Sequence, residues 1–219
     1  MIYSVETLKA SLLLRGTDVE VDPIVSVVSG DLPEPWRKEW KWAAIDIETS
    51  GLDARKHMIG AIQVANHSSV WVLRPPFRNP QNLRELVRSQ DVLKIFHHAL
   101  FDLRFLRRSL GLTAHYVACT KIAAKIVEPG LSSSLAPLLK RHFSLDIDKS
   151  LQTSDWTIGE LSGNQVLYAA NDTVYLRRLL GRMLEIAPPD ALNLILRSFE
   201  YVPSRVELDL MEIGDVFTH

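Results

Sequence analysis

The stretch WAAIDIETSGLD, at residues 42–53, joins an apolar run typical of a buried strand to a charged turn. Side chains at positions i and i+2 of a strand point to the same face, so Asp46 and Glu48 would lie close together with like charges. Gly51 favours a turn directly after this strand. Because ligands of open α/β sheets bind at the carboxyl ends of central strands, we expect the two carboxylates to line a site.

The spacing of the two acids is not specific by itself. Asp146 and Asp148, and likewise Glu207 and Asp209, are two residues apart. These pairs lie in a polar loop and near the terminus, so we interpret them as solvated surface. The apolar strand before Asp46 distinguishes the first pair.

The composition is that of a globular protein with neither a strong net charge nor a disulfide framework. The 219 residues are 47% hydrophobic, and 25 basic against 26 acidic residues give a formal charge of −1. This balance excludes a broad positive field for long nucleic acids, so nucleic-acid binding is expected to be local or short. The single cysteine, Cys119, excludes an intramolecular disulfide and leaves too few sulfurs for a structural zinc site. With no recognisable leader or membrane-length apolar run, we expect a soluble, cytoplasmic protein.

Strand patterns followed by helix patterns predict an α/β fold with a mixed central sheet flanked by helices. The predicted elements are a strand meander at 24–28, 42–47, 58–65 and 70–73, a helix from Pro80, a strand at 92–97, a helix ending near Gly111, helices at 119–127 and 133–143, and a long helix from Ser162 to Pro188. Ser162 and Gln165 fit a capping box at the start of the long helix.

The chain divides into three predicted parts. Residues 1–23 form an N-terminal extension without a clear pattern, and residues 24–187 form the principal domain. Residues 188–219 form a C-terminal helix and tail, which packs on the domain or lies in an oligomer interface.

Two further acids lie in apolar surroundings. Asp102 is one turn into a predicted helix, and Asp172 lies inside the long helix, four residues after Tyr168. Residues four apart project from one helix face, so Tyr168 and Asp172 can meet at one site. A buried carboxylate on an apolar face is costly without a cation or hydrogen-bond donors.

Two divalent cations would account for these residues together. Mg²⁺ and Mn²⁺ take oxygen ligands, and a pair of such ions can stabilise the attacking and leaving oxygens of phosphodiester cleavage. Tyr168 would orient or deprotonate the attacking water. Taken singly, each residue also has a structural interpretation: Asp102 as a cap or a partner of Arg104 or Arg108, Tyr168 as core, and Asp172 as a partner of Arg177.

Three segments in order resemble the RNase D type of DEDD 3′-5′ exonucleases, in the subgroup that carries a tyrosine. These segments are DIETSGLD at 46–53, KIFHHALFDLRFL at 94–106 and SDWTIGELSGNQVLYAANDTVYL at 154–176. The resemblance implies an RNase H-like, DnaQ-like exonuclease fold. It also implies that two Mg²⁺ or Mn²⁺ ions are held by Asp46, Glu48, Asp102 and Asp172, and that Tyr168 positions the nucleophilic water.

The chain is also similar to the nano-RNase C group of short RNase D relatives, in SGDLP at 29–33, ACTKIAAKI at 118–126, DKSLQTSDW at 148–156 and the tail from Pro203. This similarity implies short single-stranded RNA, above all dinucleotides, as the substrate, with DNA as an alternative. It further implies a homo-oligomer, up to a ring-shaped octamer. In short-RNA exonucleases a leucine after the first motif wedges between the two bases, and Leu52 is the matching position.

Three other residues are candidate substrate contacts. Thr49 belongs to the first motif, and His98 precedes the second. Trp156 is a candidate platform for base stacking or, alternatively, a brace for its loop.

The leading hypothesis is a metal-dependent 3′-5′ exoribonuclease that releases 5′-mononucleotides from short RNA. A second enzymatic reading is an exonuclease acting on longer RNA or DNA. A third, from another class, is a catalytically inactive nucleic-acid-binding module, which the complete residue set argues against.

Overall fold

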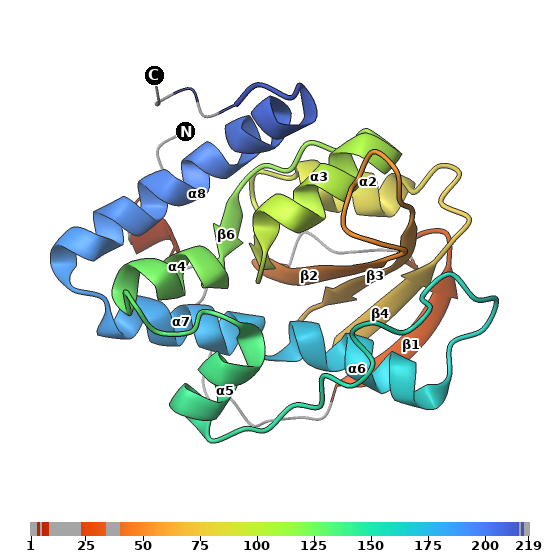
Figure 1. The fold of residues 1–219 in the computed structure, drawn as a ribbon, viewed down its shortest axis with the longest axis horizontal. Coiled ribbons are helices and arrows are strands. Elements are labelled where there is room, and N and C mark those ends of the chain that lie inside the picture. Colours follow the sequence, from red (N-terminus) through yellow and green to blue (C-terminus); the bar gives the residue numbers. More distant parts are fainter. Residues whose placement is uncertain (1–3, 5, 9–22, 34–39, 215, 217–219) are drawn as a thin grey trace.

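The computed structural model describes residues 4, 6–8, 23–33, 40–214 and 216 of the chain. Its centre is a six-stranded mixed sheet with the strand order β1-β4-β3-β2-β5-β6 (Figure 1). The strands are β1 (Ile24–Ser29), β2 (Trp42–Thr49), β3 (Ile59–Ala65), β4 (Ser69–Arg74), β5 (Leu93–Phe96) and β6 (Val117–Cys119). The short strand β6 comes directly before a helix, and the sequence pattern did not separate the two.

Strand β2 lies in the interior of the sheet because its apolar side chains are buried on both faces. Residues 42–45 and Ile47 are at most 5% exposed. β2 pairs antiparallel with β3 and parallel with β5. The strand predicted from WAAIDI is therefore confirmed, and its carboxyl end carries the two acids.

The predicted four-strand meander is wrong in its first strand. β2, β3 and β4 are consecutive antiparallel neighbours, whereas β1 pairs parallel with β4 at the edge of the sheet. Both sides of β2 are occupied by β3 and β5. In the sheet, β4 and β3 lie between β1 and β2, so these two consecutive strands do not form a hairpin.

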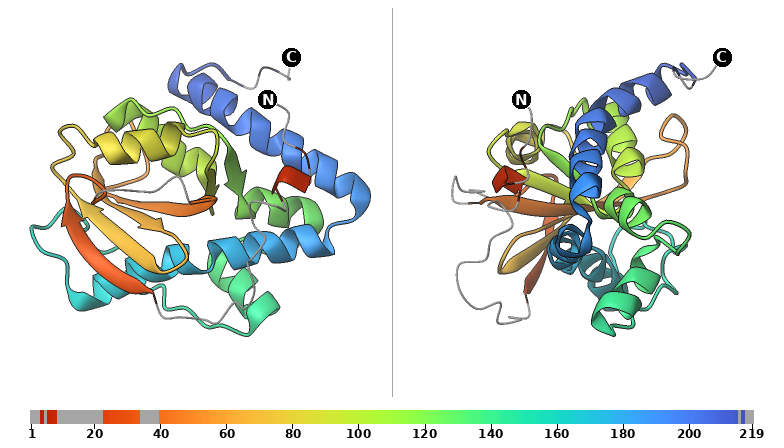
Figure 2. Two further views of the ribbon diagram at one scale, coloured as in Figure 1. Left: turned by 180° about the vertical axis from the view of Figure 1, so that it is seen from behind. Right: turned by 90° about the vertical axis from the view of Figure 1, so that its left-hand side faces the viewer.

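Helices cover both faces of the sheet. They are α2 (Gln81–Arg88), α3 (Ala99–Leu110), α4 (Thr120–Val127), α5 (Leu135–Phe143), α6 (Gly163–Val174), α7 (Leu176–Ile186) and α8 (Pro189–Leu210). α2 and α3 lie on one face, and α6 crosses the other (Figures 1 and 2). α6 contacts β2, β3 and β4.

The long helix predicted from Ser162 is present as two helices. The capping box of Ser162 and Gln165 is confirmed at the start of α6. Tyr175, with φ −90° and ψ −7°, separates α6 from α7. Asp172 consequently lies in the last turn of α6, beside the sheet, and not in the middle of a longer helix.

The C-terminal helix α8 packs against α3 and α4. The ion pair between Arg107 and Glu207, at 2.6 Å, also joins α3 to α8. The predicted extension at 1–23 lies almost entirely outside the described residues, and the three-part division of the chain stays a prediction. Among the described residues, every helix is too short or too polar to cross a membrane.

A carboxylate far away in the sequence caps helix α2. The helix begins after Pro80, as predicted, but Pro80 provides no side-chain cap. The Asp31 carboxylate instead accepts hydrogen bonds from the backbone N–H groups of Asn82, at 2.8 Å, and Leu83, at 2.9 Å. These donors have no partner within a helix, so Asp31 fixes α2 against the segment that follows β1.

We predict that Asp31→Ala lowers the free energy of unfolding by about 0.5–2 kcal/mol, the usual range for loss of an N-cap. Asp31→Asn retains an acceptor oxygen and should cost less. Urea denaturation measures both. Equal stability of Asp31→Ala and the wild type would contradict the capping role.

Candidate active site

The end of β2 presents two carboxylates to one face of the sheet. Glu48 is 8% exposed and Asp46 is partly exposed. The parallel pairing of β2 with β5 extends to Ala44 and Ile95. Asp46 and Glu48 lie beyond the last of these paired residues, at the carboxyl end of an inner strand, as the sequence predicted.

Helix α6 brings a third carboxylate to the same place. One ligand oxygen each from Asp46, Glu48 and Asp172 lies within 4.8 Å of the others. Small side chains allow this approach, because Ala61 of β3 and Ala169 of α6 are fully buried in one cluster with Tyr168. The four-residue spacing of Tyr168 and Asp172 places both polar ends at the site, and the Tyr168 hydroxyl donates a hydrogen bond to Asp172.

Asp102 approaches the site from α3 on the opposite face. Its side chain is 2% exposed, and its carboxylate accepts a hydrogen bond from the backbone N–H of Ile47 in β2. The Oδ2 atom has no hydrogen-bond partner among the described residues. Asp102 lies outside the group of three but is close enough to raise the pKa of Asp46 electrostatically.

Burial and mutual repulsion disfavour the charged forms of these acids. Burial, and then the charges of Asp102, Asp172 and Glu48, raise the pKa of Asp46. Burial, and then the charges of Asp172 and Asp102, raise the pKa of Glu48 to about 9, although Lys149 opposes them. The pKa of Asp172 is also raised by burial, against the opposing effect of Lys149. A set of buried acids with an unpartnered oxygen fits divalent cations that take oxygen ligands.

Lys149 is a site residue that the sequence interpretation missed. Its ammonium group pairs with Asp172 and lies 3.4 Å from the Tyr168 hydroxyl. Lys149 lies in a polar loop between Asp148 and Ser150, where no local pattern indicates its partner. Only the return of this loop over α6 places a positive charge beside the carboxylates.

Gln63 is a second residue that the sequence did not single out. It is directly opposite Asp46 in the register of β2 and β3, so both side chains share a face. The Gln63 amide is fully buried and makes no hydrogen bond to the described residues. The site therefore contains, beside the acids, an amide donor and an amide acceptor that make no hydrogen bond to the described residues.

Tyr168 is a neutral phenol in this environment. Burial, and then the charges of Asp172, Glu48 and Asp46, raise its pKa above the ordinary value. The hydroxyl can therefore donate to one oxygen and accept from another donor. This suits the positioning of a water better than the removal of its proton by a phenolate.

The structure contradicts the prediction that Trp156 is a substrate platform. Its side chain is 1% exposed and packs among Ala61, Val72, Tyr168 and Ala169. The Trp156 and Tyr168 ring centroids are 5.7 Å apart. A base cannot stack on a fully covered ring, so the alternative interpretation of Trp156 as a brace for its loop is the one that fits.

The remaining predicted substrate residues lie at the edge of the site or beyond it. Leu52 is 82% exposed on the turn after β2. The Thr49 hydroxyl donates to the Gly51 carbonyl at 2.7 Å and so supports that turn. His98 is exposed at the start of α3 and stacks on Phe101. Substrate contacts by these three residues stay predictions.

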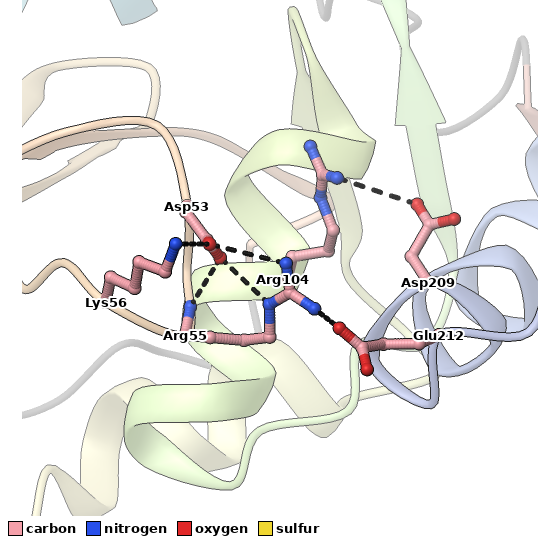
Figure 3. A network of polar contacts seen from close by, with 6 residues as sticks. All are labelled: Asp53, Arg55, Lys56, Arg104, Asp209 and Glu212. Carbon is pink, nitrogen blue, oxygen red and sulfur yellow. Dashed lines mark hydrogen bonds and ion pairs between the residues drawn. The ribbon is translucent and has the colours of Figure 1, made fainter.

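The turn that carries Leu52 is tied to the end of α8 (Figure 3). Arg55 pairs with Asp53, at 3.0 Å, and with Glu212 beyond the helix. Exposed ion pairs add little stability, so their main effect is to orient the turn. The network drawn in the figure also includes Lys56, Arg104 and Asp209.

The mixed sheet with acids gathered at the end of an inner strand has the arrangement of the RNase H-like exonucleases that match this chain in sequence and structure. The model of the 3′-5′ exonuclease family matches residues 37–187, and the chain belongs to this family. The predicted fold class is thereby confirmed.

Individual relatives support the RNase D type within this family. Ribonuclease D of Sphingobium indicum is 32% identical over 127 residues, which are 57% of this chain and 33% of that protein. The exosome complex component 10 homolog of Drosophila melanogaster is 34% identical over 142 residues, 64% of this chain and 16% of that protein. The chain thus spans a third or less of the length of these two relatives.

A solved structure matches almost the whole chain. NrnC of Brucella melitensis superposes with a TM-score of 0.83 at 30% identity, over 90% of this chain and 98% of that one. That protein has also been solved with bound Mg²⁺ and bound to pGG. The predicted resemblance to the RNase D and nano-RNase C exonucleases is confirmed.

The raised pKa of Glu48 predicts how pH affects the stability of the metal-free protein. This carboxyl has a reference pKa of 4.5 and a pKa of about 9 in the folded protein. Between these values the folded state keeps a proton that the unfolded state has lost. Its contribution to stability therefore falls as pH rises, by up to about 1.4 kcal/mol per pH unit.

We predict that, in EDTA, the wild type loses stability relative to Glu48→Gln between pH 5 and pH 9, measured by thermal or urea unfolding. Gln has no proton to lose, and other titrating groups are shared by both proteins. With added Mg²⁺, the wild type should instead gain stability relative to Glu48→Gln as pH rises, because the cation favours the charged carboxylate. Parallel pH curves for the two proteins would contradict a protonated Glu48.

Proposed function

We propose that this protein is a metal-dependent 3′-5′ exoribonuclease that hydrolyses short RNA, including dinucleotides, to 5′-mononucleotides. The observation that carries the proposal is the meeting of Asp46, Glu48 and Asp172 within 4.8 Å, beside the Tyr168 hydroxyl. Family membership supports hydrolysis at the 3′ end.

The residues divide into two roles in this proposal. Asp46, Glu48, Asp102 and Asp172 would hold two Mg²⁺ or Mn²⁺ ions, whose chemistry is to activate water and stabilise charge on the phosphate. The unpartnered Oδ2 of Asp102 and the all-carboxylate donor set fit such ions. Tyr168 would hold the water in line for attack. The P–O3′ bond breaks, which leaves a 3′-hydroxyl on the shortened strand and the 5′-phosphate on the released nucleotide.

The proposed preference for short substrates rests on two observations. NrnC of Brucella melitensis binds pGG, whose formula is that of a 5′-phosphorylated dinucleotide, and this chain matches it over 90% of its length. Leu52 projects into solvent from a turn that ion pairs hold in place. An exposed leucine at the site margin suits insertion between two bases. Assembly into a homo-oligomer and a cytoplasmic location stay predictions.

The proposal is tested with 5′-labelled RNAs of two to about twenty nucleotides and with matching DNAs, in Mg²⁺, Mn²⁺ or EDTA. We expect stepwise 3′ shortening with metal, and loss of at least about 100-fold in kcat for Asp46→Asn, with a smaller loss for Tyr168→Phe. Cleavage that survives both EDTA and Asp46→Asn would overturn the metal mechanism. A twenty-mer degraded as fast as a dimer would favour the longer-substrate alternative.

Leu52→Ala should selectively weaken hydrolysis of dinucleotides. Loss of an apolar side chain that covers two bases should cost about 1–2 kcal/mol of binding, or roughly a tenfold rise in KM. Met58→Ala is a matched control, because Met58 is 65% exposed at the other end of the same turn. Equal effects of the two substitutions on KM would argue against a specific role for Leu52.

A further inference from the structure

We propose that Arg74 is a positioning residue that holds the loop around Trp156 on the sheet and thereby fixes the orientation of Tyr168. The inference rests on the proposed function, because it assigns a role within the same site. Arg74 lies at the end of β4 and reaches Tyr168 only through the loop.

The guanidinium group of Arg74 donates hydrogen bonds to backbone carbonyl groups. Its Nη1 atom donates to Gly60 at 2.7 Å and to Trp156 at 2.8 Å, and its Nη2 atom donates to Ile158. The Arg74 residue is only 8% exposed. One guanidinium therefore joins β3 to a loop more than eighty residues further along the chain.

Arg74 has no ion-pair partner within 4 Å among the described residues; Asp155 acts on it only as a more distant charge. Burial accordingly lowers its pKa. Burying a cation that only carbonyl groups solvate costs desolvation energy, and apolar packing would stabilise the loop equally well. The directional fork of the guanidinium fixes the loop carbonyls at defined positions, which a lysine cannot do.

The loop lies directly against the backbone of β3. A Cβ atom added to Gly60 would be 2.4 Å from the Trp156 carbonyl oxygen, closer than such atoms approach. The absence of a side chain at Gly60 is therefore necessary for this contact. Together, Gly60 and Arg74 determine the position of the Trp156 backbone.

The position of Trp156 in turn determines that of Tyr168. The two rings pack with centroids 5.7 Å apart, inside a cluster that also contains Ala61 and Val72. The Gln165 amide donates to the carbonyl of Asp155 at 3.1 Å, which ties the loop to the start of α6. Tyr168 is one turn further along α6, so a shift of the loop changes the packing on one side of the phenol ring.

Arg74→Lys tests the proposal, with Arg78→Lys as the control because Arg78 is exposed just beyond the same strand. We expect Arg74→Lys to lower kcat on a dinucleotide about 10- to 100-fold, with KM and the Mg²⁺ concentration for half-maximal activity changed less than twofold. In a Tyr168→Phe background the same substitution should lower kcat less than twofold further. An unchanged kcat, or an equal loss in both backgrounds, would overturn the proposal.

A second readout does not depend on nuclease activity. In protein labelled with 3-fluorotyrosine, the ¹⁹F resonance that Tyr168→Phe removes belongs to Tyr168. We expect Arg74→Lys to shift or broaden this resonance, and Arg78→Lys to leave it in place. An unmoved resonance overturns the positioning role, whereas an inactive wild type with a shifted resonance overturns only the proposed function.

If Arg74→Lys does not fold, Trp156→Phe tests the same proposal. This variant keeps the backbone carbonyls that Arg74 binds but shortens the contact with Tyr168. We expect it to lower kcat and to shift the Tyr168 resonance in the same way. A Trp156→Phe protein with wild-type kcat and resonance would contradict the connection through the ring.

Discussion

The structure depends on the repulsion among acids that lie at the carboxyl end of β2 or that two helices bring there. Asp46, Glu48 and Asp172 lie within 4.8 Å, with the buried Asp102 close by. Burial raises their pKa values, like charge adds to this for Asp46 and Glu48, and Lys149 opposes these effects only in part. An arrangement this unfavourable persists because the surrounding sheet and helices hold it, and the same repulsion becomes affinity for cations.

The acids converge because both faces of the sheet supply them. α6 crosses one face and brings Asp172 and Tyr168, while α3 on the other face brings Asp102 to the backbone of Ile47. The two groups meet where β2 and β5 cease to pair. The separation of neighbouring strands at a carboxyl edge provides the opening in which an α/β sheet binds its ligand.

The parts of the fold and site that the sequence predicted depend on local periodicity. The apolar strand before Asp46, the four-residue step from Tyr168 to Asp172 and the capping box at Ser162 all appear as expected. The edge position of β1 and the burial of Trp156 were not foreseen. Both depend on contacts between segments far apart in the chain: β1 pairs with β4, and Trp156 packs between β3 and α6. Local sequence patterns do not predict such contacts.

The sequence by itself determined most of the strands and helices, apart from β6 and the break between α6 and α7. It also determined the carboxylates with their tyrosine, because spacing along a regular element fixes the direction of each side chain. Tertiary structure alone decided the partners of these residues. Lys149 reaches Asp172, and Arg74 reaches the Trp156 carbonyl across 82 residues, only after the loop before α6 folds back over the sheet. Such contacts join polar groups in loops and at strand ends. The residues next to these groups in the sequence do not determine the direction in which their side chains point.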